Sequence, residues 1–221
     1  MSSKLKLTYV FGAAVLSVFC FVVVALLVNT NKIVQFDNTV IAMVQSLESP
    51  GLTQVMKLFT FIGATPAVII LSLAILIFLY RVLHHRMEII LLVIILAGTA
   101  IFNQLLKFTF QRERPDLHRL IQESGYSFPS GHSMEAFALY AALAFLLWKH
   151  ISKQSGRLTV ILLSVCMIFM IGLSRIYLGV HYPSDVVGAY FAGGIWFSLS
   201  VWCFQWYKEH RYRQTKKADR V

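Results

Sequence analysis

The amino-acid sequence predicts an all-α, polytopic membrane protein, a bundle of six transmembrane helices in a single integral-membrane domain, 1–221. The first observation is composition: 57% of the residues are hydrophobic and only 14% are charged, which is unusual for a soluble domain of this size. The second is that six apolar stretches approach the ~20 residues that a helix needs to cross a bilayer. Unpaired backbone groups are costly in lipid, so these stretches should be helical. They lie near residues 8–29, 57–80, 87–107, 132–149, 158–178 and 186–206.

The first stretch, 8–29, follows Lys4 and Lys6 in the manner of a signal peptide. Its apolar part is longer than a usual signal-peptide core, and no clear small-residue cleavage site follows it, so we expect a retained anchor. The second stretch, 57–80, contains Pro66, which has no backbone N–H. This proline is expected to kink that helix or to mark its true start.

Residues 36–47 are too short to span a bilayer, although apolar side chains recur there at helical spacing. These side chains are Phe36, Val40, Met43, Val44 and Leu47. We expect an amphipathic helix that lies on the outer membrane surface, where it would help to form a rim for lipid entry. A helix packed on the ends of the bundle fits the pattern equally well.

Small residues recur one turn apart in the last stretch, 186–206: Gly188, Ala192 and Gly193. Such residues let neighbouring helices approach closely. We interpret them as a packing feature rather than as a ligand site.

The Lys and Arg residues are unequally divided between the two sides that alternate spans define. Thirteen of the 20 fall on the side that carries both termini, and an excess of positive charge marks the cytoplasmic side. We therefore expect a multi-pass protein of the cell membrane with both termini cytoplasmic. The net charge of +10 does not indicate nucleic-acid binding, because these residues form no basic face with interleaved aromatics.

Three short motifs at the ends of the predicted spans hold most of the chemically useful side chains. They are Lys107-x6-Arg114-Pro115, Pro129-Ser130-Gly131-His132 and Ser174-Arg175-x5-His181-x3-Asp185. Alone, each has an ordinary explanation, such as a lysine at a helix end or a turn whose aspartate caps a helix. The alternation of spans places all three on the outward side, where together they supply cations, imidazoles and a carboxylate for an anionic substrate.

The second motif has the features of a phosphate-binding helix start. Ser130 is a suitable N-cap, and free N–H groups at Gly131 and His132 would point out of the helix towards an anion. Glycine also allows the anion to approach the backbone closely. An ordinary capped helix with a solvent-facing histidine is the alternative.

The third motif pairs His181 with Asp185 at a spacing that suits a nucleophile and its orienting carboxylate. The carboxylate can hold one ring N–H and leave the other nitrogen free to attack. The histidines and the aspartate could also ligate a metal. However, three cations at the same place, on Lys107, Arg114 and Arg175, would repel a divalent ion and attract an anion. We therefore expect no metal and no other cofactor.

These motifs, with their spacing intact, closely resemble the signatures of the type 2 phosphatidic acid phosphatase family of integral-membrane lipid phosphatases. The resemblance implies that His181 attacks phosphorus, that Asp185 orients His181, and that His132 protonates the leaving group and later activates water. It further implies a set of phosphate-binding residues: Lys107, Arg114, Ser130, Gly131 and Arg175. The family is metal-independent, and its chemistry consists mainly of positioning the phosphoryl group and balancing its charge.

The chain is most similar in size to bacterial phosphatidylglycerophosphatases of the B type and undecaprenyl pyrophosphate phosphatases. We therefore expect hydrolysis of phosphatidylglycerophosphate, with undecaprenyl pyrophosphate, phosphatidic acid and diacylglycerol pyrophosphate as alternatives. A transporter with an ionisable relay is the non-enzymatic alternative, but relay groups should lie near the bilayer midplane rather than at span ends. The expected partners are the lipid substrate and the bilayer, with no nucleic acid and no obligatory protein partner.

Charged residues near the motifs receive less specific interpretations. Glu135 lies one turn after His132, where it either complements the helix start or selects among headgroups. The other charged residues of the outer loop are expected to be solvated: Arg112, Glu113, His118, Arg119 and Glu123. For Arg112, contact with a lipid headgroup is an alternative.

Overall fold

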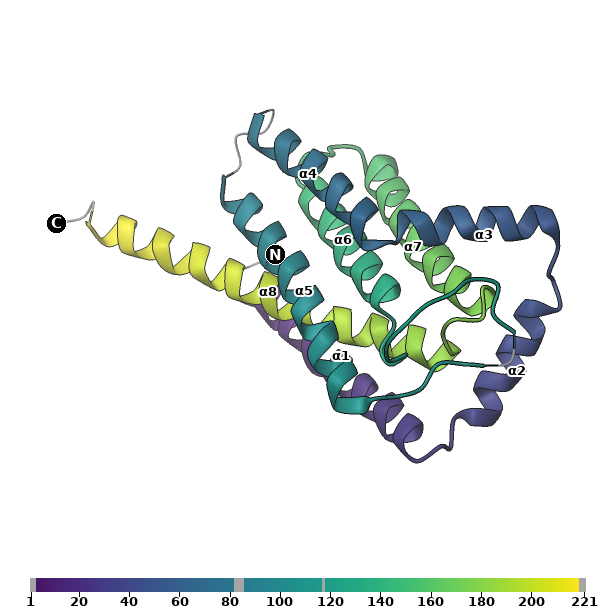
Figure 1. The fold of residues 1–221 in the computed structure, drawn as a ribbon. Coiled ribbons are helices and arrows are strands. Elements are labelled where there is room, and N and C mark those ends of the chain that lie inside the picture. The colour runs from purple at the N-terminus through teal and green to yellow at the C-terminus, as the bar shows by residue number, and fades with distance from the viewer. Residues whose placement is uncertain (1–2, 82–85, 117, 219–221) are drawn as a thin grey trace.

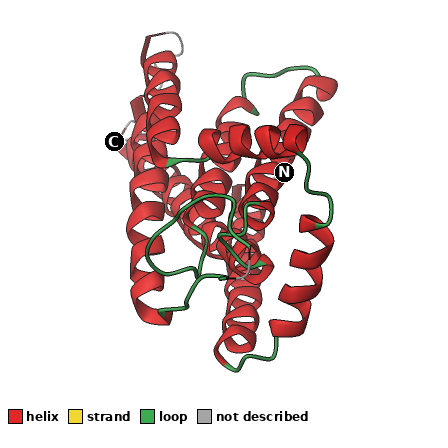
Figure 2. Ribbon diagram, turned by 45° about the vertical axis from the view of Figure 1, so that its right-hand side comes forward, coloured by secondary structure: helices red, strands yellow, loops and turns green. Residues whose placement is uncertain are grey.

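The computed structural model describes residues 3–81, 86–116 and 118–218, and within these ranges the chain forms helices and no strands. The helices are α1 (Ser3–Asn29), α2 (Val34–Gln45), α3 (Pro50–Ile62), α4 (Thr65–Arg81), α5 (Arg86–Phe110), α6 (Gly131–Leu147), α7 (Gln154–Tyr177) and α8 (Pro183–Ala218). Figure 2 shows that the longest irregular connection joins α5 to α6. The predicted all-α fold is confirmed.

Helix α6 lies in the middle of the bundle, in contact with α5, α7 and α8, while α1 runs alongside α8 (Figure 1). One part of the core joins Leu91, Leu92 and Ile95 of α5 to Ala138 and Ala142 of α6, together with residues of α8. The C-terminal part of α8 extends beyond the bundle (Figure 1).

Among the residues that the structure describes, four helices are long and apolar enough to cross a membrane. Their candidate spans are Leu7–Asn29, Met87–Phe110, Gln154–Tyr177 and Pro183–Arg211. The pair α3 and α4 meets the same criteria only when taken together, and it bends by 56° at its break. Helix α6 is apolar, but its 17 residues reach about 26 Å, which is less than the hydrocarbon thickness of about 30 Å. Length and composition thus identify up to five of the six predicted spans.

The predicted span 57–80 is interrupted at Gly63 and Ala64, where α3 ends and α4 begins. Pro66 lies in the first turn of α4, a position where the missing N–H costs no hydrogen bond. Of the two roles expected for this proline, the structure therefore supports the start of a helix. Helix α3 itself begins at Pro50, which is earlier than predicted.

The amphipathic helix expected at 36–47 is present as α2, and it packs on the ends of α7 and α8. Its buried residues are Asp37 and Ile41, whereas Phe36 and Met43 of the predicted apolar face are exposed. The prediction missed this orientation because it considered only apolar spacing. The inward face is centred on a buried carboxylate.

The small residues of α8 serve packing, as expected, and the two glycines lie against aromatic rings. A Cβ atom at Gly188 would lie 2.5 Å from the ring of Phe128, and one at Gly193 would lie 3.0 Å from Phe137. Ala192 is fully buried. The first of these contacts seats the chain just ahead of Ser130 directly on α8.

Candidate active site

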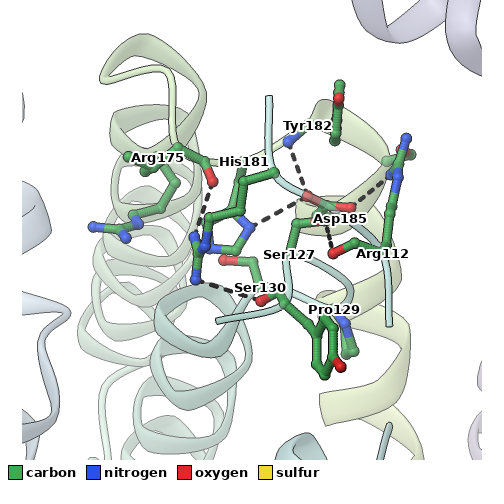
Figure 3. Close-up of polar contacts among 12 residues, drawn as sticks. Arg112, Ser127, Pro129, Ser130, Arg175, His181, Tyr182 and Asp185 are labelled. Carbon is green, nitrogen blue, oxygen red and sulfur yellow. Dashed lines mark hydrogen bonds and ion pairs between the residues drawn. The ribbon is translucent and has the colours of Figure 1, made fainter. Parts of the chain in front are cut away.

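The three polar motifs converge at one end of the bundle, around the side chain of His181 (Figure 3). Lys107 comes from the last turn of α5, and Arg175 comes from the last turn of α7. Asp185 lies in the first turn of α8, and Arg114 lies in the α5–α6 connection. Segments far apart in the sequence therefore meet, as the motif pattern predicted.

His181 is held by both ring nitrogens and is only 1% exposed. Its Nδ1 lies 3.3 Å from Oδ2 of Asp185, and its Nε2 lies 3.1 Å from Nη1 of Arg114. A proton on Nδ1, donated to the carboxylate, leaves the lone pair of Nε2 facing the guanidinium. The backbone N–H of His181 donates to the carbonyl of Arg175 at 3.3 Å, which fixes the ring above the end of α7.

The surroundings of His181 favour its neutral form. Burial lowers the pKa of this imidazole well below its usual 6.5, and the positive charges of Arg175, Arg114 and Lys107 lower it further. A neutral imidazole is the form that can act as a nucleophile. The cations predicted to bind phosphate thus keep the imidazole of His181, the predicted nucleophile, unprotonated.

Asp185 is completely buried and accepts hydrogen bonds from several sides (Figure 3). Its Oδ2 accepts from the backbone N–H of Tyr182 at 2.9 Å in addition to facing His181. Its Oδ1 accepts from Nη1 of Arg112 at 2.6 Å. These bonds fix the carboxylate next to the imidazole, and the predicted pairing of His181 with Asp185 is present.

Arg112 is not solvated, contrary to the sequence-based expectation. Its side chain is 15% exposed and forms ion pairs with Asp185 and with Asp37 of α2, at 2.6 and 2.8 Å. Arg114-Pro115 offered a signal for this, because the residue before a proline is usually extended and alternate residues of an extended segment lie on the same side. The role of Asp37 was missed because an isolated acidic residue on a short helix is usually solvated.

Arg114 also orders the α5–α6 connection from inside. Its Nε donates to the carbonyl of Gly125 at 2.9 Å, its Nη2 donates to that of Ser124 at 3.0 Å, and its Nη1 donates to that of Val180 at 2.9 Å. Only 8% of the residue is exposed. The same guanidinium therefore shapes the loop and meets the ring of His181.

Arg175 is buried behind the imidazole and forms an ion pair with Glu123, which the sequence placed in the solvated loop. A second amino group of Arg175 bonds to the hydroxyl of Thr60 in α3. Burial alone would raise the pKa of Glu123, but the charge and hydrogen bond of Arg175, aided by His132 and Arg114, lower it overall. Glu123 is thus an anion that faces the predicted phosphate-binding cations.

The N-cap predicted at Ser130 is present at the start of α6. Oγ of Ser130 accepts from the backbone N–H of Ser133 at 3.4 Å, and Ser130 is fully buried. A Cβ atom at Gly131 would lie 3.3 Å from Oδ1 of Asn103 and 4.0 Å from Nζ of Lys107, so the ammonium approaches the helix start where glycine leaves room. The amide of Asn103, absent from the sequence prediction, donates to the carbonyl of Pro129 at 3.2 Å and steadies this turn.

His132 occupies the first turn of α6, and the charges of Arg175, Glu123 and Lys107 all act on its half-buried imidazole. Glu135, one turn further, accepts a hydrogen bond from the hydroxyl of Thr65 at 3.2 Å. That contact links α6 to the start of α4. All the predicted site residues therefore lie together at this end of the bundle.

Across the ranges that the structure describes, no group of three or more His, Cys, Asp or Glu side chains is arranged to hold a metal ion. His181 and Asp185 are engaged with arginine side chains. Guanidinium groups suit the oxygens of a phosphate, which they can hold through paired hydrogen bonds.

A family model described as PAP2 superfamily matches residues 88–209, which include all three motifs. The phosphatidylglycerophosphatase B of Bacillus subtilis (strain 168) is 32% identical over 184 residues, covering 81% of this chain and 88% of that protein. The chain belongs to the PAP2 superfamily. A putative undecaprenyl-diphosphatase of Escherichia coli (strain K12), YbjG, is also 32% identical, over 63% of this chain and 68% of that protein.

The fold agrees with a solved member of the PAP2 superfamily. The crystal structure of a transmembrane PAP2 type phosphatidylglycerolphosphate phosphatase from Bacillus subtilis matches with a TM-score of 0.74 and 30% identity. The match covers 85% of this chain and 93% of that one. With its apolar helices, this likeness makes the protein a multi-pass membrane member of the PAP2 lipid phosphatases.

Proposed function

We propose that this PAP2 protein hydrolyses phosphatidylglycerophosphate to phosphatidylglycerol and phosphate, by way of a phosphohistidine and without a metal ion. The observation that carries the chemical part is the ring of His181, with Asp185 on one nitrogen and Arg114 on the other. The substrate is supported by similarity, over most of both chains, to a protein named phosphatidylglycerophosphatase B.

In the first step, Nη1 of Arg114 turns from Nε2 of His181 to a phosphate oxygen, and Nε2 attacks phosphorus while the bond from phosphorus to the lipid oxygen breaks. The electron pair of that bond stays on the departing oxygen, which takes a proton from His132. Asp185 stabilises the positive charge that develops on the His181 ring and keeps its Nδ1 protonated. The products of this step are the dephosphorylated lipid and a phosphoryl group on His181.

In the second step, His132 removes a proton from water as the oxygen attacks phosphorus. The bond between phosphorus and Nε2 breaks, its electron pair returns to the imidazole, and inorganic phosphate leaves. His132 is then protonated for the next turnover. The reversal of roles at one histidine is the usual consequence of running two related displacements in a single site.

The non-bridging oxygens are held by Lys107, Arg114 and Arg175, with Ser130 and the backbone N–H of Gly131 at the helix start. Fixed donors aimed at developing charge are worth about 10²- to 10³-fold in rate each. Arg175 pairs with Glu123 through Nη2, whereas its buried Nε has no hydrogen-bond partner among the described residues, so a phosphate that bonds to Nη2 has to displace Glu123.

We also propose that the site faces the outer side of the cell membrane and that both termini are cytoplasmic. The excess of Lys and Arg in the loops on the terminal side supports this orientation. The residues of the α5–α6 connection are suitable reporters. Single cysteines there should react with an impermeant maleimide added to intact cells, and labelling only after lysis would contradict the orientation.

Undecaprenyl pyrophosphate is the second candidate substrate, because the similarity to a putative undecaprenyl-diphosphatase covers more than half of this chain. The two candidates differ in the leaving group, which is an alcohol in one case and a lipid phosphate in the other. The cationic site suits either, so the choice between them depends on turnover rather than on geometry.

The test is release of inorganic phosphate from phosphatidylglycerophosphate and from undecaprenyl pyrophosphate, each in detergent micelles with EDTA present. One preparation of the native protein is compared with His181→Asn, whose side chain is polar but has no nitrogen that can be phosphorylated in this way. Turnover by the native protein alone, fastest on phosphatidylglycerophosphate, is the expected result. Equal release by both proteins, or complete loss of activity with EDTA, would contradict the mechanism, and faster turnover of the pyrophosphate would replace the substrate.

A further inference from the structure

The guanidinium of Arg112 lies between two buried carboxylates that come from opposite ends of the sequence. Nη1 donates to Oδ1 of Asp185 at 2.6 Å, and Nη2 donates to Oδ2 of Asp37 at 2.8 Å. Both aspartates are completely buried. The guanidinium carbon also lies 4.0 Å from the centre of the Tyr182 ring, which closes one face of the group. Arg112 is therefore fixed by hydrogen bonds at both of its amino groups and by the aromatic ring against the plane of its guanidinium.

Asp37 holds the backbone next to Asp185 as well as the arginine. Its Oδ1 accepts from the backbone N–H of Ser184 at 2.9 Å, and its Oδ2 accepts from the Ser184 hydroxyl at 2.6 Å. That hydroxyl also accepts from Arg112 at 2.8 Å. One carboxylate of α2 thus fixes both the residue before Asp185 and the cation that bonds to Asp185.

Charge explains why these contacts act as a unit. Two carboxylates buried close together repel each other, and each loses the hydration that it has in water. The single guanidinium between them compensates both, through hydrogen bonds that are stronger than those between neutral groups. Removing either partner would leave a buried charge without compensation, which is far more costly than removal of an exposed pair.

The same contacts position α2 on the bundle. Ile41, one turn from Asp37, packs against Ile176 of α7 and Val186 of α8, so the inward face of α2 combines this apolar contact with the ion pairs. The short helix is therefore connected to the nucleophile by a continuous path: Asp37, Arg112, Asp185 and His181.

We infer that Asp37 and Arg112 are positioning residues for the phosphatase reaction, which act through Asp185 to hold the imidazole of His181 in line with phosphorus. This inference rests on the proposed function. Neither side chain touches the substrate in this scheme. Their loss should therefore reduce the rate of the chemical step and leave substrate binding largely unchanged.

The experiment compares kcat and KM for phosphatidylglycerophosphate in micelles between the native protein, Asp37→Asn and Arg112→Ala. Misplacement of a reacting group by about 1 Å costs about 10²-fold. We expect kcat to fall by about that factor in both variants and KM to change by less than about threefold. Thermal unfolding of the same preparations checks that the variants are folded.

Glu48→Gln is the matched control. Glu48 pairs with His118 at 2.8 Å and so ties the same loop to the end of α2, but this pair is exposed and does not touch Asp185. The Glu48→Gln substitution should leave kcat within about twofold of the native value, because exposed ion pairs contribute little to stability. The control separates a general loss of loop attachment from a specific loss of carboxylate position.

Two further measurements test whether Asp37 acts on Asp185 through Arg112. Free guanidinium ion should restore part of the activity of Arg112→Ala, because it can refill the space between the two carboxylates, and it should not activate Asp37→Asn. The kcat of the double variant, Asp37→Asn with Arg112→Ala, should lie within about threefold of the kcat of Arg112→Ala alone, because the effects of residues that act through one another are not additive.

The inference is overturned if Asp37→Asn and Arg112→Ala keep kcat within the range of the Glu48→Gln control, or if KM rises by the same factor as kcat falls. If those variants do not fold, Ser184→Ala decides, since it removes one hydrogen bond to Asp37 and one to Arg112. A fall in kcat of threefold or more at constant KM supports the inference, and an unchanged kcat refutes it. Absence of turnover by the native protein would instead refute the proposed function.

Discussion

Glu123 and Arg175 form an ion pair at the point where the cations that we propose to bind phosphate converge. One partner comes from the loop after α5, and the other is a buried residue of α7. Because the pKa of Glu123 is lowered by Arg175, by its hydrogen bond and by nearby His132 and Arg114 in spite of burial, this carboxylate is charged at neutral pH. A substrate phosphate must therefore compete with an anion that belongs to the protein.

Replacement of Glu123 by glutamine should make anions bind more tightly. A hydrogen bond to a charged group is worth about 1.5–3 kcal/mol, so loss of this competitor should lower the inhibition constant of inorganic phosphate by about tenfold or more. The measurement is competitive inhibition by phosphate at fixed pH. Glu113→Gln is the control, since Glu113 is an exposed acid of the same loop. An unchanged constant in Glu123→Gln would mean that the pair does not occupy the phosphate site.

The acid limb of the pH profile should lie well below pH 6.5, because the pKa of His181 is lowered by burial and then by the cations around it. A group with a lowered pKa stays neutral, and so able to attack, until the pH falls to that lower value. Lys107→Gln removes one of the cations. The pKa of His181 should then rise, and the acid limb of kcat/KM should move up towards pH 6.5.

The position of the limb is independent of the overall loss of rate that the missing cation causes. Rate profiles of the native protein, Lys107→Gln and the exposed control Lys57→Gln, recorded between about pH 4 and pH 8, make the comparison. A limb that stays in place in Lys107→Gln, or one that moves equally in Lys57→Gln, would exclude His181 as the titrating nucleophile.

His132→Gln should lower kcat for phosphatidylglycerophosphate by about 10²- to 10⁴-fold, because an alkoxide leaves poorly without a proton donor. The loss should be much smaller for the first step with p-nitrophenyl phosphate, whose leaving group needs no proton. Phosphoenzyme should then accumulate, since water lacks its base, and release of nitrophenol should show a burst followed by slow turnover. Equal losses with both substrates and no burst would contradict the assignment of His132 as acid and base.

The sequence was enough to predict where the motif residues lie, but not to predict which other side chains form hydrogen bonds or ion pairs with them. His181, Asp185 and Ser130 lie where spacing and helix-start chemistry predicted, because those features are local. The sequence alone indicates solvated side chains for Arg112 and Glu123, because only the folded loop turns them inwards to partners on α8 and α7. The break between α3 and α4 was indicated by its proline, whereas nothing in the local sequence specifies the 56° angle of the bend.

Gly188→Ala should destabilise the protein and also slow it, because the added methyl group would lie 2.5 Å from the ring of Phe128. Phe128 is fully buried against Phe21 and Phe110, so it cannot swing away, and such overpacking costs about 1–3 kcal/mol. Any shift of this ring moves the turn that leads into Ser130. We therefore expect a lower unfolding temperature together with a reduced kcat.

Gly12→Ala is the matched control, since a Cβ atom there meets nothing within 4 Å and glycine is the weaker helix former by about 0.5–1 kcal/mol. It should leave activity unchanged and keep or raise the unfolding temperature. Thermal unfolding in detergent and phosphate release measure the two effects on the same samples. Full activity in a destabilised Gly188→Ala would show that the contact between α8 and Phe128 supports the fold but does not set the position of the helix start.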